Sequence, residues 1–538
     1  MAYTPSKWTI EENARYWERR ATRRLTDAEK QGEAHSKRIQ KMYEQANRNI
    51  QRDIENIYAN YSKATGLDVQ SLKTLLTKTE TKKLWDELKA KGLDKYVKGN
   101  YKARITRLEQ LQAQLYAKVK EIYLKEQKLS TDCYTGIIND TYYKAIYDTQ
   151  MGTGYDFTFS TLDDNLVKSV LNEGWSGKNY SQRIWGNTDI LAQKVSEIVG
   201  GALMSGQSLA KTSRQIRERF NVCKYYADRL ARTETNHFHN QADAMAYEEM
   251  DVDKYVFMAV LDTRTSKRCQ NLDNKVIELK DKKDGLNFPP LHPNCRSTTR
   301  AYMGEEIEKT LKRRARNPIT GKNEVIDNMS YSEWYNSKVK AHGQENIDKA
   351  FKISKNRSAD IKQFESYKSR LKGSSHLPTN IDKFVDMKYN NTAKFQELTE
   401  HYRYKGRVPE ATEKDFKTYK AIKETGVRGS VRVPPLPSQR AYILEDKAFK
   451  KDPSHIMKRM WERHITDDEV QSYVDNALFS ISQFKGTRRA FYSKEGVTVL
   501  TQTKDYEGVE WIVKTTWNKT DFDEDVEKMI KEALRNGK

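Results

Sequence analysis

The sequence has little cysteine, a modest apolar fraction and no long apolar run, and each shortage excludes a class of protein. Four cysteines among 538 residues do not make a disulfide scaffold. Apolar residues are 37% of the chain and charged residues 32%, which suffices for helical modules but is too polar for one large compact core. No run of eighteen apolar residues occurs and no signal-peptide pattern follows Met1. We therefore expect a soluble protein made in a cytoplasm, with room for three or more domains.

Acidic residues are scarce relative to basic ones, and the formal net charge is +21. Residues 1–130 hold 28 Lys and Arg against 17 Asp and Glu, whereas residues 455–538 hold 14 against 15. The basic surplus therefore lies upstream of the last part of the chain, where it suits contact with DNA or with an acidic protein surface. A solvated helical surface would carry the same charge, so both interpretations stay open.

The first 130 residues predict long helices. Apolar side chains recur every three or four residues from Ile39 to Tyr61 and again from Ile105 to Tyr123. A shorter helix is predicted between them, from Leu72 to Lys91, and Lys and Arg occupy the other faces. We expect a basic helical hairpin or elongated bundle over residues 1–130, with no catalytic role of its own.

Residues 255–300 carry the densest cluster of constrained side chains. A strand-like run from Val256 to Leu261 ends in the polar sequence DTRTS, which suits a tight turn. A second apolar run follows at Val276 and Ile277. Three prolines in the sequence FPPLHPNC then exclude a helix. A stiff extended loop is therefore expected at this point.

Cys269, His292 and Cys295 admit two interpretations. Two thiols and one imidazole supply three of the four ligands of a tetrahedral zinc site, and Asp262 or Asp273 is available as the fourth. No second cysteine completes a C-x2-C pair with Cys269. The alternative is a pair of buried thiols beside a histidine that bonds a loop carbonyl. A structural zinc is thus one of two open interpretations.

Polar residues also gather on the segment before this cluster. A helix over Arg232–Tyr247 would place Arg232, Thr235 and His239 near one face, at spacings of three and four. His237 and His239 could bind metal, although a histidine on a helix is more often a hydrogen-bonded polar residue.

Several blocks in this region resemble one known family. They are LARTETNHFHNQADAMAY from Leu230, LDxRTSxxC from Leu261 and PPLHPNCRS from Pro289, and YWERRA at residues 16–21 precedes them. In this order they are similar to the Mu F-like phage head morphogenesis family, over about residues 10–310. The resemblance implies a mixed α+β core at residues 131–310 and a minor capsid protein of a tailed bacteriophage. Such a protein would bind portal and major capsid proteins, and packaged DNA is a further candidate partner. It would assemble in the host cytoplasm and reside in the virion, in the capsid interior or at the portal vertex.

Residues 311–450 predict a helical connector that ends in a linker. The sequence LKRRARNPITGKNEV at 311–325 is basic and rich in turn formers, which suggests an extended strap. Polar helices are predicted from about Gly343 to Thr425. The segment from Val427 to Ser438 combines Gly, Pro and Arg, so it is the best linker candidate and sets a boundary within residues 430–452.

Residues 451–538 predict a small α+β domain. One helix carries His455 and Arg459, and a capping box at Thr466 starts a second helix that reaches about residue 479. Three strand-like runs follow at 488–492, 497–503 and 509–517, with turn sequences between them, and a final helix spans 522–534. Strict alternation in the third strand would put Trp511 and Trp517 on one face. The expected sheet is an antiparallel meander.

This domain resembles the phage branch of the barnase–EndoU–colicin–RelE group of RNases. The resemblance is loose, covers about 85 residues and rests on the helix–helix–meander order and on the pattern HxxxRxxxRH from His455 to His464. RNA cleavage of this kind needs no metal. It requires a base for the 2′-hydroxyl, an acid for the leaving oxygen and cations near the phosphorane.

The candidate catalytic residues divide by role. His464 is the first choice for acid–base chemistry and His455 the second. The candidates for stabilising the phosphorane or donating to phosphate are Arg459, Arg488, Lys514, Tyr492 and Thr515. The alternative is that the helix-borne residues are ordinary exposed side chains.

Together these features predict a mainly helical, multidomain minor head protein that acts in head assembly and DNA packaging and carries a nuclease-like toxin domain acting on RNA. One alternative is a prophage-encoded polymorphic toxin or effector whose N-terminal part only delivers it. Its C-terminal domain would then be an ADP-ribosyltransferase or a non-enzymatic binding domain. No clear series of Arg, Ser-Thr-Ser and Glu-x-Glu in residues 455–538 supports the transferase.

Overall fold

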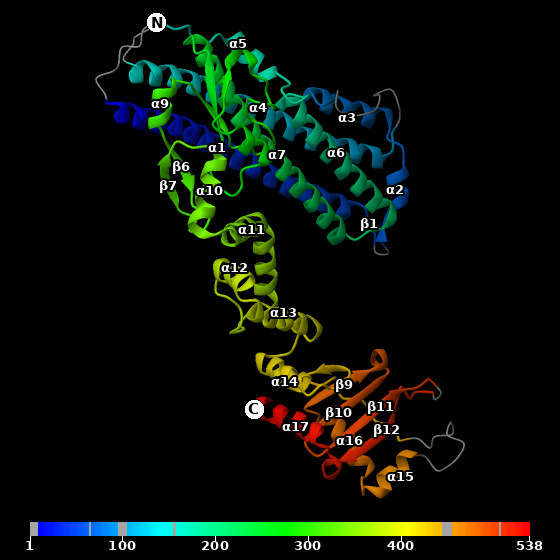
Figure 1. Ribbon diagram of the computed structural model, residues 1–538. Helices are drawn as coiled ribbons and strands as arrows, with labels where there is room; N and C mark the ends of the chain where they lie inside the picture. Colours follow the sequence, from blue (N-terminus) through cyan, green and yellow to red (C-terminus); the bar gives the residue numbers. More distant parts are fainter. Residues whose placement is uncertain are drawn as a thin grey trace. The chain divides into compact units, whose positions relative to one another are not determined.

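The computed structural model describes residues 9–63, 66–94, 105–153, 158–443, 455–504 and 507–537. Within these ranges the protein is mostly helical, with a few small antiparallel sheets (Figure 1). The chain divides into two compact units, residues 1–351 and 352–538. These findings agree with the predicted mainly helical, multidomain fold. Over the described residues no helix is long and apolar enough to cross a membrane.

Long helices form the framework of the first unit. Its helices are α1 (Ile10–Asn60), α2 (Val69–Lys73), α3 (Lys78–Ala90), α4 (Arg107–Thr153), α5 (Asp164–Asn172), α6 (Tyr180–Ser205), α7 (Leu209–Glu249), α8 (Lys267–Leu272), η2 (Leu279–Asp281), α9 (Glu305–Thr310) and α10 (Tyr331–His342). α1 begins at a capping box between Thr9 and Glu12, and α7 begins at Ser208, whose side chain accepts from the amide of Lys211. Capping side chains satisfy backbone amides that the first helical turn leaves unpaired, so the helix starts are locally encoded.

One hydrophobic core joins the N-terminal helices to those that follow. The predicted apolar stripe of α1 is buried in it, for example at Tyr43 and Ile54, and packs with Val119 of α4, Val195 of α6 and Phe220 of α7. α4 also runs without a break through residue 130. The predicted domain boundary between residues 130 and 131 is therefore wrong, because both sides of it belong to one helix and one core.

Two small antiparallel sheets complete the first unit, besides the short β1–β2 pair (Ser62–Lys63 and Gly66–Leu67). The order β4-β3-β5 joins Val276–Glu278, Lys254–Met258 and Thr298–Ala301. Strands β6 (Lys312–Arg316) and β7 (Asn323–Asp327) form a hairpin. Ala315 of β6 packs with Leu261 and Trp334 in one apolar cluster. Residues 311–342, predicted as part of a connector, therefore belong to the first unit.

The second unit combines helices with a five-stranded sheet. Its helices are α12 (Ile381–Asn390), α13 (Thr392–Arg407), α14 (Glu413–Glu424), α15 (His455–Glu462), α16 (Asp467–Asp475), η3 (Phe484–Gly486), η4 (Lys519–Asp521) and α17 (Glu524–Gly537). α11 (Gln344–Arg370) crosses the division between the units. The sheet order is β12-β11-β10-β9-β8, from Trp511–Asn518, Gly496–Gln502, Arg488–Tyr492, Phe479–Gln483 and Ser430–Arg432. The predicted meander is thus confirmed and has two further strands.

The segment predicted as a linker is part of this sheet. β8 pairs with β9 from Ser430↔Ser482 to Arg432↔Ser480. Tyr404 of α13 donates its hydroxyl proton to the Val433 carbonyl at 2.6 Å. The predicted start of an independent domain at residue 451 is therefore wrong, because the sheet and its core include residues from 404 onward.

Helices cover both faces of the sheet. α15 and α16 pack on the face that carries Phe491, Leu500 and Trp511, and α14 and α17 pack on the face that carries Val499 and Trp517. The pairs Val499↔Thr515 and Leu500↔Val513 leave Lys514 as an extra residue in β12. Such a bulge reverses the alternation of side chains. The prediction that both tryptophans share a face is therefore wrong.

Candidate functional site

The segment 254–301 is built around β3, as its apolar run predicted. β3 pairs with β4 through Tyr255↔Ile277 and with β5 through Phe257↔Thr299. α8 follows the tight turn, and its N-cap Ser266 accepts a hydrogen bond from the backbone amide of Cys269 at 3.3 Å. The cysteine is thereby fixed on the first turn of a short helix beside the sheet.

Asp262 organises the turn between β3 and α8. Its carboxylate accepts two bonds from Arg296, at 2.7 and 2.8 Å, and further bonds from the Arg264 amide and the Thr265 hydroxyl, at 2.9 and 3.0 Å. Burial opposes ionisation of this carboxyl, but the bonds from Arg296, Arg264 and Thr265 outweigh burial and lower the pKa of Asp262. The bonds between Asp262 and Arg296 therefore connect the turn to the end of the proline-rich loop.

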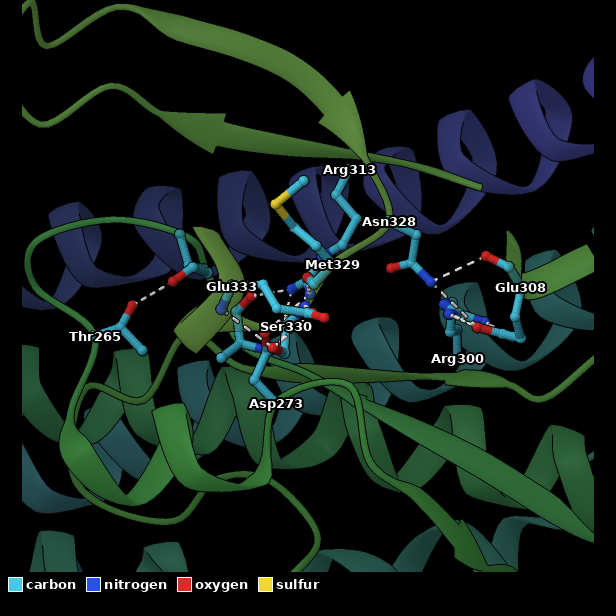
Figure 2. A network of polar contacts seen from close by, with 11 residues as sticks. Thr265, Asp273, Arg300, Glu308, Arg313, Asn328, Met329, Ser330 and Glu333 are labelled. Carbon is cyan, nitrogen blue, oxygen red and sulfur yellow. Dashed lines mark hydrogen bonds and ion pairs between the residues drawn. The ribbon is translucent and has the colours of Figure 1, made fainter. Parts of the chain in front are cut away.

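Asp273 is engaged by a second arginine that sequence analysis did not single out (Figure 2). Arg313 of β6 donates to both carboxylate oxygens at 2.9 Å, and to the carbonyls of Ala259 and Met329 at 2.7 Å. The Ala259 amide also donates to Asp273 at 2.6 Å. The sequence around Arg313, a run of basic residues, did not indicate that Arg313 pairs with Asp273, because Asp273 lies 40 residues earlier. Figure 2 also shows Arg300 paired with Glu308, which accepts from Asn328.

Cys269, His292 and Cys295 come together as predicted. Their ligand atoms all lie within 4.8 Å of one another. Sγ of Cys269 lies 3.4 Å from Nε2 of His292 and 3.7 Å from Sγ of Cys295. Nδ1 of the histidine lies 2.9 Å from the Pro293 carbonyl, to which it donates. A hydrogen bond from Cys295 lowers the pKa of Cys269 to about 6, and the same bond raises the pKa of Cys295.

The loop that carries the histidine is held by Arg268. Its guanidinium donates to the carbonyls of Leu291 and Gly285, each at 2.8 Å. Both cysteines are buried, in an apolar cluster that includes Phe257. Asp262 and Asp273, considered from the sequence as a fourth metal ligand, do not join this cluster in the described structure and are each held by an arginine. The trio therefore offers three donor groups, and no further His, Cys, Asp or Glu of the described residues joins it.

Two cavities adjoin the trio. One of about 650 Å³ is bordered by His292, Cys295 and Arg296, and by Arg232, Thr235 and His239 of α7. The second, of about 520 Å³, is bordered by His292, Trp175 and Glu234. The prediction that Arg232, Thr235 and His239 share a face is therefore confirmed, because all three border the same cavity.

In the described residues, neither His237 nor His239 belongs to a group of three or more side chains that could hold a metal ion. His239 lies 3.1 Å from the Thr141 hydroxyl and 3.5 Å from the Asp243 carboxylate. His237 stacks on Trp175 with ring centroids 5.0 Å apart, and burial lowers its pKa to about 3. Both histidines are therefore part of the packing of α7.

Glu234 is a buried carboxylic acid beside the second cavity. Its side chain is buried, accepts from Trp175 Nε1 at 3.2 Å and lies 3.8 Å from the Arg183 guanidinium. Burial raises its pKa to about 7. A carboxyl that titrates near neutral pH responds to small changes in its surroundings, so its protonation is coupled to how this part of the unit is packed.

In the second unit the candidate catalytic residues divide between the two faces of the sheet. Arg459 lies on α15, and the exposed His464 follows that helix with a left-handed φ of 52°. Arg488, Tyr492 and Thr515 lie on the opposite face, by their strand positions beside Ala490 and Val499. The helix-borne and strand-borne candidates therefore do not converge from one side.

The remaining candidates lie at the edge of this domain. His455 is the first residue of α15, and its side chain lies outside the described residues. Lys514 is the exposed bulge residue of β12. The end of α15 is fixed to β12 by Arg463, which donates to the Thr516 carbonyl at 2.6 Å and pairs with Asp521 at 2.9 Å.

Comparison with known proteins bears on the first unit. Residues 193–300 match the family described as Phage Mu protein F like protein. This match supports a Mu F-like phage protein. The Mu F-like segment, residues 193–300, begins within α6 and ends in β5, so it contains α7, the Asp262 turn and the trio of Cys269, His292 and Cys295.

A second similarity is to NAD(+)--arginine ADP-ribosyltransferase EFV of Enterococcus faecalis (strain ATCC 700802 / V583). The two chains are 24% identical over 213 residues, which are 37% of this chain and 42% of that protein. This chain therefore spans less than half the length of that relative. No solved structure matches the chain.

Proposed function

We propose that this protein acts in head morphogenesis of a tailed bacteriophage, as a minor head protein that binds portal and major capsid proteins. The supporting observation is the family match over residues 193–300, which coincides with the tightly bonded turn and loop around Asp262. In this proposal the protein belongs to the virion and assembles in the host cytoplasm.

The chemistry of the Mu F-like segment favours binding over catalysis. Asp262 and Asp273 are neutralised by arginines, and His239 is buried in the packing of α7. These side chains therefore serve to hold one backbone geometry. A rigid surface of this kind suits an assembly contact, because little entropy is lost when it binds.

Basic helices supply a surface for the partner. α3 carries the exposed residues Lys78, Lys82, Lys83 and Lys89.

Co-expression with the portal and major capsid proteins of the same genome, followed by sedimentation of the heads, tests the proposal. We expect Lys82→Glu with Lys83→Glu to reduce incorporation. The matched control exchanges exposed lysines of α17, Lys528→Glu with Lys531→Glu, and should leave incorporation unchanged. A wild-type chain absent from the heads contradicts the assembly role.

DNA is the alternative occupant of this basic surface. If the surface binds packaged DNA, the affinity of the full chain for duplex DNA should fall steeply with salt, because each neutralised phosphate releases counterions. The Lys82→Glu, Lys83→Glu chain should then show a smaller salt slope. A flat salt dependence would instead favour the portal or capsid protein as the partner.

A second candidate function, metal-independent RNA cleavage, belongs to the second unit. The order of two helices before an antiparallel meander supports it. Because the sheet includes β8, the full chain is the sample. We expect His464→Ala to slow cleavage at least about a hundredfold if it is the acid or base. Exposed Arg535→Ala is the control.

The same samples test an ADP-ribosyltransferase, the activity in the name of the similar Enterococcus faecalis protein. Labelled NAD⁺ and an arginine-containing acceptor would reveal transfer by the full chain. A folded chain that is inert on RNA and on NAD⁺ would make the second unit a binding domain, and the assembly proposal would stand unaffected.

A further inference from the structure

We propose that Cys269, His292 and Cys295 form a zinc site whose fourth ligand is water supplied from the adjoining cavity. The zinc would hold the proline-rich loop against α8 and the sheet. It is independent of whether the protein acts in head assembly, because it depends only on the geometry of the three side chains.

Two of the three separations between the donor atoms fit the edges of a zinc tetrahedron, and the third, between Cys295 Sγ and His292 Nε2, is within 4.8 Å. Zinc binds thiolate sulfur at about 2.3 Å and imidazole nitrogen at about 2.0–2.1 Å, so a tetrahedral site has a sulfur–sulfur edge of about 3.8 Å and a sulfur–nitrogen edge of about 3.5 Å. The corresponding distances here are 3.7 Å between the Sγ atoms and 3.4 Å from Cys269 Sγ to His292 Nε2. A disulfide would need the sulfurs at about 2.05 Å.

The histidine is already arranged as a metal ligand. Its Nδ1 donates to the Pro293 carbonyl at 2.9 Å, which in the neutral ring leaves Nε2 as the unprotonated nitrogen, and it is Nε2 that faces the sulfur of Cys269. A ligating histidine commonly donates its other ring proton to a carbonyl in this way, which fixes the tautomer and the ring plane. Arg268 fixes the same loop through the carbonyls of Leu291 and Gly285.

Burial and charge also favour zinc. The two cysteines lie in an apolar cluster and are 2% and 3% exposed. Two thiolates with one Zn²⁺ make a neutral group, so the site avoids the cost of burying an isolated charge. Asp262 and Asp273 are held by arginines, and the cavity of about 650 Å³ is bordered by His292 and Cys295. No other His, Cys, Asp or Glu of the described residues joins the trio, so the proposal takes water from this cavity as the fourth ligand.

The full chain, purified without chelator under reducing conditions, tests the proposal by elemental analysis and X-ray absorption. We expect about one zinc per chain, with two sulfur ligands near 2.3 Å and two nitrogen or oxygen ligands near 2.0–2.1 Å. Cys269→Ser and Cys295→Ser should each reduce zinc at least tenfold. Cys133→Ser and Cys223→Ser change the other two free cysteines and should keep full zinc content.

A chelator experiment on the unaltered chain avoids variants that fail to fold. Removing zinc should expose Cys269 and Cys295 to alkylation and increase deuterium exchange over residues 266–296, with no change at the half-buried Cys133. Readdition of zinc should restore protection. A folded chain that takes up no zinc when zinc is supplied overturns the proposal. The proposal is also overturned if Cys133→Ser lowers the zinc content as much as Cys269→Ser and Cys295→Ser do. A Cys269–Cys295 disulfide in the freshly isolated protein would overturn it as well.

Discussion

Removing Arg313 should strongly destabilise the packing of the β6–β7 hairpin on the Mu F-like segment. The guanidinium donates two bonds to Asp273 and one each to the carbonyls of Ala259 and Met329. The Asp273 side chain is fully buried and that of Arg313 is 5% exposed. Arg313→Met would leave a buried carboxylate with the Ala259 amide as its remaining donor (Figure 2).

The expected loss follows from this geometry. Breaking a buried ion pair by removing one partner costs about 3–5 kcal/mol, and each buried carbonyl left without a donor adds about 1 kcal/mol or more. We therefore expect at least about 4 kcal/mol for Arg313→Met. The neighbouring Lys312 forms an exposed pair with Asp327 in the same hairpin. Its matched variant Lys312→Met should cost at most about 1 kcal/mol.

Hydrogen exchange is the suitable assay, because a chain of two units does not unfold in one step. Opening free energies of the amides in β3 and β6 should fall by the amounts given above. In a double-mutant cycle, Arg313→Met with Asp273→Asn should recover part of the loss, since no charge remains buried. Equal small losses for Arg313→Met and Lys312→Met would refute the argument that this buried pair holds the hairpin.

Three further predictions concern other positions. Burial raises the pKa of Glu234 to about 7 from 4.5, so its contribution to stability is fully present below about pH 4.5 and is lost as the pH rises through 7. Glu234→Gln should remove this decline and raise stability at pH 8 by up to about 3 kcal/mol, measured by hydrogen exchange against pH. Asp262→Ala should unfold the turn locally by freeing Arg296, so limited proteolysis should cut residues 262–296 faster; unchanged cleavage would contradict its organising role. Gly496→Ala should lower the free energy of unfolding of the second unit by about 1–3 kcal/mol, because the new Cβ would lie 2.3 Å from the Tyr473 ring. A thermal scan of the full chain measures this loss. An unchanged melting temperature of that unit would show that the ring can move.

Much of the local structure was predictable because it depends on neighbouring residues. The apolar stripe of α1, the capping boxes at Thr466 and Ser330, and the strand at Val256 all arise from periodicity or from side chains that bond the nearest backbone. The trio of Cys269, His292 and Cys295 was also visible, because cysteine and histidine are rare in this chain and prolines stiffen the loop between them.

Sequence reasoning failed where a choice among many equivalent partners had to be made. Nothing in the spacing of the arginines assigns Arg313 to Asp273 and Arg296 to Asp262. The segment from Val427 to Ser438, which contains β8, suits a linker by its Gly, Pro and Arg residues, yet an open edge of β9 was available for pairing. The bulge at Lys514 moved Trp517 to the other face of the sheet.

Local periodicity, capping and turn chemistry therefore determined the helices, the β3 strand and the stiff loop, since each acts within a few residues. The tertiary structure alone decided that α1, α4, α6 and α7 share one core across residue 130. It also decided which arginine neutralises each buried aspartate, and which sheet face receives each candidate catalytic residue. These outcomes depend on contacts between segments far apart in the chain, where burial selects one partner among many of the same type.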